Sequence, residues 1–341
     1  MKIENKRQWV GELFFLLGTI LYITYYFFYI AYYWYVEKDP TRQIPVQRLF
    51  YIGLICFVVK IILTKYQWKE VIIGAAGAVL MYLCWKSSGG IDYPANYLII
   101  LAMKDVDLKK VMKAVFACGF VGLSYGFTWF FVNAPDKLTT VKDYGRGMIE
   151  VRYKFCTWHA NTIHLMIMVL IVSFLYAYYK KMKWWAFAIM FYFNYEFYQL
   201  SKSRTAFYCG SAAIIAYFIL RYARKIYEFK ISLILLEIGN LVGIFLSIYY
   251  GLYSQLTDPT FMRLDQLITG RLTVARNCFL EAGIPLFGSN IGGKVCGYGI
   301  YTQANDGYVT ELGIVRTLLE YGPIVFGLFC CFYADSCMGT L

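Results

Sequence analysis

Arginine stands among small hydroxyl residues in a short turn between two apolar runs, in the segment Ser201-Lys202-Ser203-Arg204-Thr205-Ala206. A planar guanidinium binds a phosphate through two parallel hydrogen bonds, and its charge is costly in apolar surroundings without a partner. Ser203 or Thr205 could cap the helix that follows, and the first turn of a helix also favours anions. We therefore expect Arg204 and Ser203 to bind a phosphate. The alternative is that Arg204 only reaches lipid headgroups.

Two more arginines lie in a second segment, which runs from Thr269-Gly270-Arg271 through Arg276 to the turn Pro285-Leu286-Phe287-Gly288. The residues between these points predict a helix over 271–282, with both arginines near its start and a glycine-rich turn after it. We expect Arg271 and Arg276 to bind the same class of anion. The alternative is a surface helix whose charges are solvated.

A third segment places Arg152 shortly before His159-Ala160-Asn161-Thr162, at the start of another apolar run. His159 and His164 are the 2 histidines of the chain. Their separation of five residues points them to different faces of a helix, which does not make a paired metal site. Because no carboxylate-rich cluster is near, we expect neither a metal nor another cofactor. His159 is a candidate catalytic residue, as a ligand or as a general base, and a structural histidine is the alternative.

The fourth segment is Asn305-Asp306-Gly307-Tyr308, just before the last apolar run. Asp306 could act as a general base or as the partner of an arginine, and it could equally cap the next helix. Two further carboxylates, Glu196 and Glu237, lie inside apolar runs, where an ionisable side chain is a functional candidate. Lys60 and Arg316 are the basic residues that could pair with them.

These segments belong to a chain of 341 residues, of which 60% are hydrophobic and 16% are charged. A soluble domain is about 45–50% apolar and about 25% charged. The composition therefore excludes an ordinary soluble enzyme and a disordered chain, and it leaves a polytopic membrane protein. The net charge of +12 reflects basic residues at the ends of apolar runs. Without zinc-finger spacing or a recognition helix, we expect no nucleic-acid partner.

A transmembrane helix needs about 20 mostly apolar residues. The apolar runs predict an all-α polytopic membrane protein with about ten transmembrane helices, forming a single integral membrane domain over 1–341. The runs are 11–36, 49–64, 70–85, 92–103, 114–132, 157–179, 184–200, 205–220, 231–250 and 311–333.

The loops between these runs differ in their density of basic residues, which predicts that both termini lie on the inner side of the membrane. Two long loops, 133–156 and 251–310, are then extracytoplasmic, and the second separates the last two spans. Loops of this length in a compact fold are usually functional. Both carry arginines although basic residues are disfavoured on the outside, which indicates an anionic ligand.

Together, the segments resemble the O-antigen polymerase and O-antigen ligase-like family. The shared motifs are Ser-Arg-Thr-Ala at the start of a span, Thr-Gly-Arg and then Pro-Leu-Phe-Gly in a long outer loop, and Asp-Gly-Tyr before Glu-Tyr-Gly in a final span. The sixth span starts with His-Ala-Asn-Thr, where the family often has His-Pro-Asn, so Ala160 is a departure. The resemblance covers residues 150 to 330 approximately and rests on the order of the motifs.

The resemblance implies a membrane glycosyltransferase of the cell envelope. The activity it implies is that of a polysaccharide polymerase for capsule, O-antigen or exopolysaccharide synthesis, which joins repeat units carried on undecaprenyl diphosphate at the outer face of the cytoplasmic membrane. Residue by residue, the resemblance carries over to Arg204 and Arg271, and then to Arg152 and His159. Taken with the candidates above, the predicted catalytic residues are Arg204, Arg271, Asp306 and His159. The predicted substrate-binding residues are Arg152, Ser203, Arg276, Asn161 and Tyr308. Expected partners are the undecaprenyl-diphosphate-linked oligosaccharide, the lipid bilayer, a flippase and a chain-length regulator protein.

Two alternatives remain from the sequence. A ligase of the same superfamily would transfer a finished glycan to a final acceptor. A flippase for lipid-linked oligosaccharide would belong to another class, and such transporters usually show repeated halves. No internal repeat is visible in this sequence.

Overall fold

The computed structural model describes the chain except residues 1–2, 32–39, 136–137, 144–148, 156, 158, 224, 226–229, 256, 269, 292–311 and 339–341. The chain forms two compact units. Unit 1 comprises Met1–Tyr66, Leu98–Asp143 and Ile149–Arg224, and unit 2 comprises Gln67–Tyr97, Tyr144–Met148 and Lys225–Leu341. The prediction of a single membrane domain stays a prediction.

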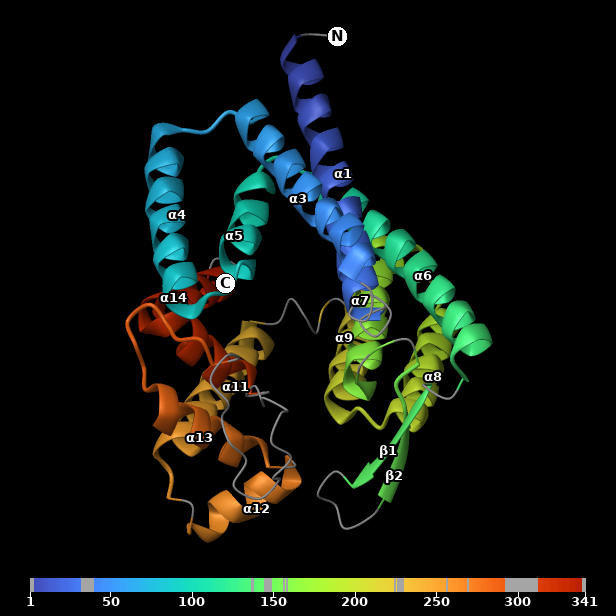
Figure 1. Ribbon diagram of the computed structural model, residues 1–341, viewed down its shortest axis with the longest axis vertical. Coiled ribbons are helices and arrows are strands. Elements are labelled where there is room, and N and C mark those ends of the chain that lie inside the picture. Colours follow the sequence, from blue (N-terminus) through green and yellow to red (C-terminus); the bar gives the residue numbers. More distant parts are fainter. Residues whose placement is uncertain are drawn as a thin grey trace. The chain divides into compact units, whose positions relative to one another are not determined.

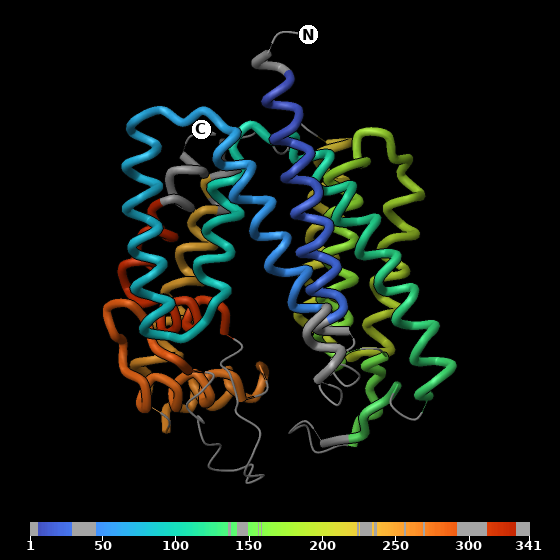
Figure 2. Tube along the Cα trace, turned by 45° about the horizontal axis from the view of Figure 1, so that its top comes forward, coloured from blue at the N-terminus to red at the C-terminus, as the bar shows by residue number. Residues whose placement is uncertain are grey.

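Unit 1 is mainly helical (Figure 1). Its helices are α1 (Ile3–Ala31), α3 (Pro40–Leu63), α6 (Leu108–Asn133), α7 (Ala160–Tyr178), the short η2 (Tyr179–Lys181), α8 (Trp184–Ser201) and α9 (Arg204–Tyr222). The helix α1 packs against α3 and α6, and α7 packs against α6, α8 and α9. Figure 2 shows α1 and α3 running side by side along most of their length.

The contact between α1 and α3 depends on two glycines that face each other. A Cβ atom on Gly18 would lie 3.1 Å from the carbonyl oxygen of Gly53, and one on Gly53 would lie 3.2 Å from that of Gly18. Small residues allow two backbones to approach closely, which drives helix association in a membrane where apolar side chains gain nothing by leaving lipid. The glycine pair therefore explains why these two helices are close neighbours.

The helix α7 lies at the centre of unit 1. Of its membrane-length span, 56% is buried, against 11–28% for the other helices of comparable length and hydropathy. Its apolar side chains, including Ile163, Ile167 and Leu170, form one core with Phe130 of α6 and Phe187 of α8. This burial fixes the position of the α7 start, which carries the third motif segment.

A β-hairpin precedes α7 in the predicted loop 133–156. Strands β1 (Thr139–Asp143) and β2 (Ile149–Tyr153) pair antiparallel, with Thr140 opposite Arg152. The all-α prediction did not include these strands. Their alternation of threonine, valine and charged residues suits a half-exposed strand, but it is too short to distinguish from loop in a sequence dominated by apolar runs.

Unit 2 contains α4 (Trp68–Ser88), the first half of α5 (Asp92–Ala102), α11 (Lys230–Ile248), the π-helical turn η3 (Tyr249–Tyr253), α12 (Pro259–Leu267), α13 (Arg271–Ala282) and α14 (Gly313–Met338). The second half of α5 belongs to unit 1. The bounds of α13 confirm the helix predicted over 271–282. It begins after Gly270 and ends at Gly283, both with positive φ (80° and 64°).

Seven of the helices in the described part of the chain are long and apolar enough to cross a membrane. They are α1, α3, α4, α6, α7, α9 and α14. The predicted spans 92–103, 184–200 and 231–250 are helical as well (α5, α8 and α11) but lie outside this set, and α5 has only 11 residues. The predicted helical architecture is thus confirmed, and the seven apolar helices are compatible with a multi-pass membrane protein, whereas ten spans and an inner N-terminus stay predictions.

Candidate functional site

Arg152 lies on β2 and is 4% exposed. Its Nε and Nη2 atoms both donate to the Oε2 atom of Glu150, at 2.9 and 2.7 Å. Residues two apart on a strand share one face, so the strand itself brings this pair together. A guanidinium held by two charge-assisted hydrogen bonds has a fixed orientation. The sequence analysis identified Arg152 but missed Glu150, although the spacing of two would have revealed it once the strand was known.

His159 occupies the N-cap position of α7. Its Nδ1 atom accepts a hydrogen bond from the backbone N–H of Asn161 at 3.1 Å, and the hydroxyl of Thr157 donates to the carbonyl of His159 at 2.9 Å. When Nδ1 accepts, the neutral imidazole carries its proton on Nε2. In this geometry His159 offers a proton and has no lone pair left to remove one. The arrangement favours hydrogen-bond donation over a role as general base.

The turn between α8 and α9 carries the first motif segment. Ser201 ends α8, Lys202 adopts the left-handed conformation (φ 54°), and Ser203 is the N-cap residue of α9. The backbone N–H of Ser203 donates to the hydroxyl of Ser201 at 3.2 Å. The hydroxyl of Ser203 makes no cap hydrogen bond, contrary to one expectation. Both serines are buried, whereas Arg204 is exposed.

A buried polar network lies under this turn and joins three helices. His164 of α7, which is 0% exposed, contacts the hydroxyl of Ser201 through Nδ1 at 2.9 Å and the Oδ1 atom of Asn194 through Nε2 at 3.0 Å. The Nδ2 atom of Asn194 donates to the carbonyl of Phe207 and to the hydroxyl of Ser211, each at 3.0 Å. The sequence analysis used His164 only to argue against a metal. Its position inside an apolar span, like that of Asn194, was the signal for this network.

One assignment of hydrogens satisfies the whole network. The carbonyl of Phe207 only accepts, which fixes Nδ2 of Asn194 on that side and leaves Oδ1 as the acceptor facing His164. His164 must then donate from Nε2 and accept at Nδ1 from the hydroxyl of Ser201. That hydroxyl oxygen in turn accepts from the N–H of Ser203. A neutral His164 therefore ties the α8–α9 turn to the centre of unit 1.

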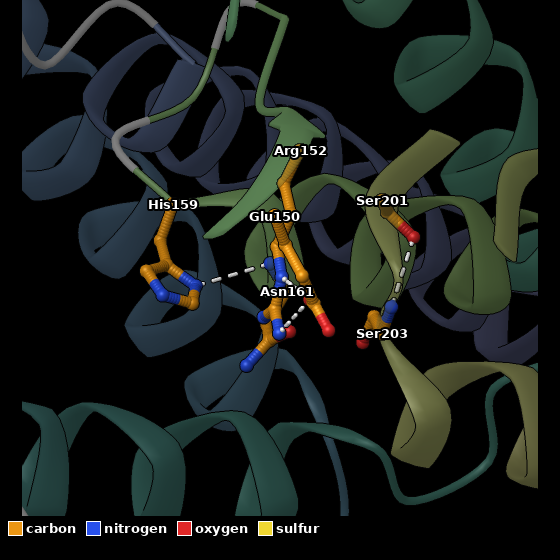
Figure 3. Close-up of polar contacts among 6 residues, drawn as sticks. All are labelled: Glu150, Arg152, His159, Asn161, Ser201 and Ser203. Carbon is orange, nitrogen blue, oxygen red and sulfur yellow. Dashed lines mark hydrogen bonds and ion pairs between the residues drawn. The ribbon is translucent and has the colours of Figure 1, made fainter. Parts of the chain in front are cut away.

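These residues bring two of the four predicted segments together in unit 1, the third and the first (Figure 3). Arg152 and Glu150 extend from β2 beside the start of α7, where His159 and Asn161 lie, and Ser201 and Ser203 come from the α8–α9 turn. The contacts between the elements agree with this picture, since β2 contacts α8, and α7 contacts both α8 and α9. Arg204 follows directly in the chain as the first residue of α9.

Arg271 and Arg276 lie in unit 2, on α13. The start of this helix is already occupied by a carboxylate: Oδ1 of Asp265 accepts from the N–H groups of Leu272 and Thr273 at 2.8 and 3.1 Å. The anion that a helix start favours is thus supplied by the chain itself. Two nitrogens of Arg276, Nε and Nη1, are buried and have no hydrogen-bond partner within the described residues. Asp306, Tyr308 and Thr269 lie outside the described residues.

The Pro-Leu-Phe-Gly and Glu-Tyr-Gly motifs contact each other in unit 2 and have a structural explanation. Gly322 (φ 82°, ψ 168°) interrupts α14, and Pro323 follows it. Because proline has no N–H, the carbonyl of Leu319 loses its helical donor. The N–H of Ser289, which follows the first motif, donates to that carbonyl at 2.9 Å. A Cβ atom on Gly288 would overlap the carbonyl oxygen of Glu320, so the approach requires glycine.

The charged groups inside apolar helices also differ from expectation. Arg316 pairs with Glu320 on α14 at 2.9 Å, and Lys60 donates to the hydroxyl of Thr64 and the carbonyl of Lys104. Neither basic residue pairs with Glu196 or Glu237, which corrects those suggested pairs. Beside the Arg316–Glu320 pair, burial raises the pKa of the Tyr93 hydroxyl, and the charge of Glu320 adds to this effect.

The fold is helical, its apolar helices are compatible with a multi-pass membrane protein, and a polar cluster lies at one end of unit 1. No protein-family model, no curated protein and no solved structure matches the chain. Within the described ranges, no group of three or more histidine, cysteine, aspartate or glutamate side chains could hold a metal ion.

Proposed function

We propose that this protein is a membrane glycosyltransferase of the O-antigen polymerase type, which transfers glycan repeat units between undecaprenyl-diphosphate carriers for cell-envelope polysaccharide synthesis. The observation that carries the proposal is the convergence in unit 1 of Arg152, the His159–Asn161 segment and Ser203, which directly precedes Arg204 in the chain. Arg152 and His159 belong to one segment of the sequence, and the Ser203–Arg204 segment is separated from it by α7 and α8.

The chemistry requires little covalent work from the protein. Diphosphate is a good leaving group, and the developing negative charge on its oxygens must be stabilised by donors already in place. Arg152, oriented by Glu150, and Arg204 at the start of α9 would supply such charge from two different elements of unit 1. His159, whose Nδ1 atom accepts from the N–H of Asn161, adds a polar group at the same end of unit 1.

The acceptor sugar must be oriented, and its hydroxyl must lose a proton. Asp306 remains the proposed base. In unit 2, Arg271 and Arg276 are proposed as ligands of a phosphate group, and the two buried nitrogens of Arg276 that have no hydrogen-bond partner within the described residues support this role. Asn161 and Tyr308 complete the proposed substrate-binding set.

The test compares two arginines at opposite ends of one helix. Arg204 is the first residue of α9 and Arg221 lies in its last turn. In a strain that lacks the gene, Arg204→Ala should fail to restore the high-mass polysaccharide ladder, whereas Arg221→Ala should restore it. Membrane levels of both variants are measured by immunoblot. Wild-type chain lengths with Arg204→Ala and with Arg152→Ala would refute the proposal.

The lipid-linked intermediates distinguish the polymerase from its alternatives. Accumulation of single repeat units on the carrier at the outer face indicates a polymerase. Accumulation of long lipid-linked polymer indicates a ligase. Repeat units trapped at the inner face indicate a flippase.

A further inference from the structure

A pocket of about 360 Å³ lies in unit 1, between the start of α1 and the end of α3. Its charged lining residues are Arg7, Lys60, Lys65 and Asp105, so three basic groups face one acidic group. Sites for small ligands measure about 300–1,000 Å³. The pocket is therefore large enough for a small anionic group and carries the opposite charge.

Lys60 is the unusual member of this set, because it is only 2% exposed. A lysine near the end of a membrane helix normally extends its ammonium group to water or lipid headgroups. Lys60 instead donates to two neutral oxygens, the Thr64 hydroxyl at 2.8 Å and the Lys104 carbonyl at 2.9 Å. None of the carboxylates in the described ranges makes an ion pair with it. Asp105 and Glu12 are near enough to attract this ammonium, but neither makes an ion pair with it, and Glu12 is paired with Lys110. A buried ammonium whose direct partners are both neutral is costly, which indicates an anion supplied from outside the chain.

Two neighbours hold the pocket in shape. Gly11 of α1 leaves room for the lysine side chain, because a Cβ atom there would lie 3.2 Å from the Cδ atom of Lys60. Arg7, one helical turn earlier, donates from Nη2 to the carbonyl of Ile62 at 2.8 Å. This bond holds the exposed guanidinium of Arg7, which comes from α1, against the end of α3.

We infer that this pocket binds the phosphate of an anionic phospholipid headgroup, with Lys60 and Arg7 as its ligands. Basic pockets between transmembrane helices suit such headgroups. A free phosphate ion presents the same chemistry, so the experiment must separate the two sources. The inference does not depend on the proposed glycosyl transfer, since its residues are distinct from the polar cluster at the starts of α7 and α9.

The experiment measures the melting temperature of the purified full-length protein in neutral detergent. The added probes are phosphatidylglycerol, phosphatidylcholine and sodium phosphate. A ligand that binds only the folded state raises the melting temperature in proportion to its affinity. Phosphatidylglycerol should raise it and phosphatidylcholine should not. A rise with sodium phosphate alone would support the phosphate site and assign it to a free anion.

Variants decide whether the effect belongs to this pocket. Lys60→Met keeps the stem and removes the charge, and it should weaken phosphatidylglycerol binding by about tenfold or more, as expected for one charged hydrogen bond. Asp105→Asn removes the opposing charge and should strengthen binding. Lys109→Met removes an exposed charge on α6 in the same unit and should change nothing. If Lys60→Met fails to fold, Arg7→Gln provides the same test, because it also removes one positive charge from the pocket and should weaken phosphatidylglycerol binding. The inference would be overturned if phosphatidylglycerol raised the melting temperature of the Lys60 or Arg7 variant as much as that of the wild type, and Asp105→Asn also left this rise unchanged.

Discussion

Replacing His164 with leucine should destabilise unit 1 and displace the α8–α9 turn. The side chain is fully buried and connects α7 to α8 through two hydrogen bonds, at 2.9 Å to Ser201 and at 3.0 Å to Asn194. Leucine has a similar size, so the substitution removes the bonds without leaving a large cavity. The Ser201 hydroxyl would then lose its acceptor while still receiving the Ser203 N–H.

The expected magnitude follows from these contacts. Hydrogen bonds between membrane helices contribute about 0.6 kcal/mol on average and at most about 1.7 kcal/mol. Two such bonds give about 1–3 kcal/mol, and a buried Asn194 oxygen without a donor adds about 1–3 kcal/mol. Because the terms overlap, we expect His164→Leu to lower the free energy of unfolding by about 2–4 kcal/mol.

A double-mutant cycle with Asn194→Leu measures the bond itself. Reversible unfolding in mixed micelles gives the free energy for the wild type, both single variants and the double variant. The loss of unfolding free energy in the double variant should be smaller, by about 1 kcal/mol, than the sum of the losses in the two single variants. The reason is that the double variant leaves neither bonding partner unsatisfied. Ser173→Ala is the matched control. Ser173 is buried on the same helix, but its hydroxyl donates only to the carbonyl of Val169 in α7.

Additive single effects, within about 0.3–0.5 kcal/mol, would refute the network as described. Loss of stability in the Ser173 control equal to that in His164→Leu would refute the claim that the interhelical bonds matter. If the network positions Arg204, polysaccharide synthesis by His164→Leu should stay low even at temperatures where the variant is fully folded. Wild-type synthesis under those conditions would separate the network from the proposed site.

Three further predictions concern single contacts. Gly288→Ala should lower the free energy of unfolding by more than about 3 kcal/mol, because φ is positive at this residue and the methyl group would overlap a carbonyl of α14. The control Gly243→Ala, where a Cβ atom would have nothing within 4 Å, should be neutral or stabilising. The melting temperatures of both variants test this prediction. Asp265→Ala should destabilise the start of α13 by about 1–2 kcal/mol, seen as faster amide hydrogen exchange there and not in α12. Glu150→Gln should remove the charge that orients Arg152 and lower polysaccharide synthesis while the protein level stays unchanged. Full activity would show that the pair only stabilises the hairpin.

The sequence by itself determined the class of the protein and the place of its helices. Sixty per cent hydrophobic residues cannot be covered by a soluble fold of 341 residues, and each predicted run coincides with a helix. The helix over 271–282 was predicted with its correct bounds. Helix positions depend on local properties, namely the length of an apolar run and the glycines that end it, and these are visible along the chain.

The candidate site was predictable only as a set of separate segments. The sequence selected Arg152, His159 and Arg204 for their chemistry, but their convergence depends on how α7, α8 and α9 pack. Glu150 became a partner of Arg152 only because a strand forms there. The general-base role for His159 is disfavoured for a similar reason, since its Nδ1 atom is engaged at the start of α7.

Tertiary structure alone decided the long-range contacts. His164 and Asn194 are both polar residues inside apolar helices, and no local pattern says that they bond to each other. The interruption of α14 was visible as Gly322-Pro323, yet the carbonyl freed there is satisfied by Ser289, which is distant in sequence. In apolar surroundings every buried polar group needs a partner, and the packing of the helices determines which residue supplies it.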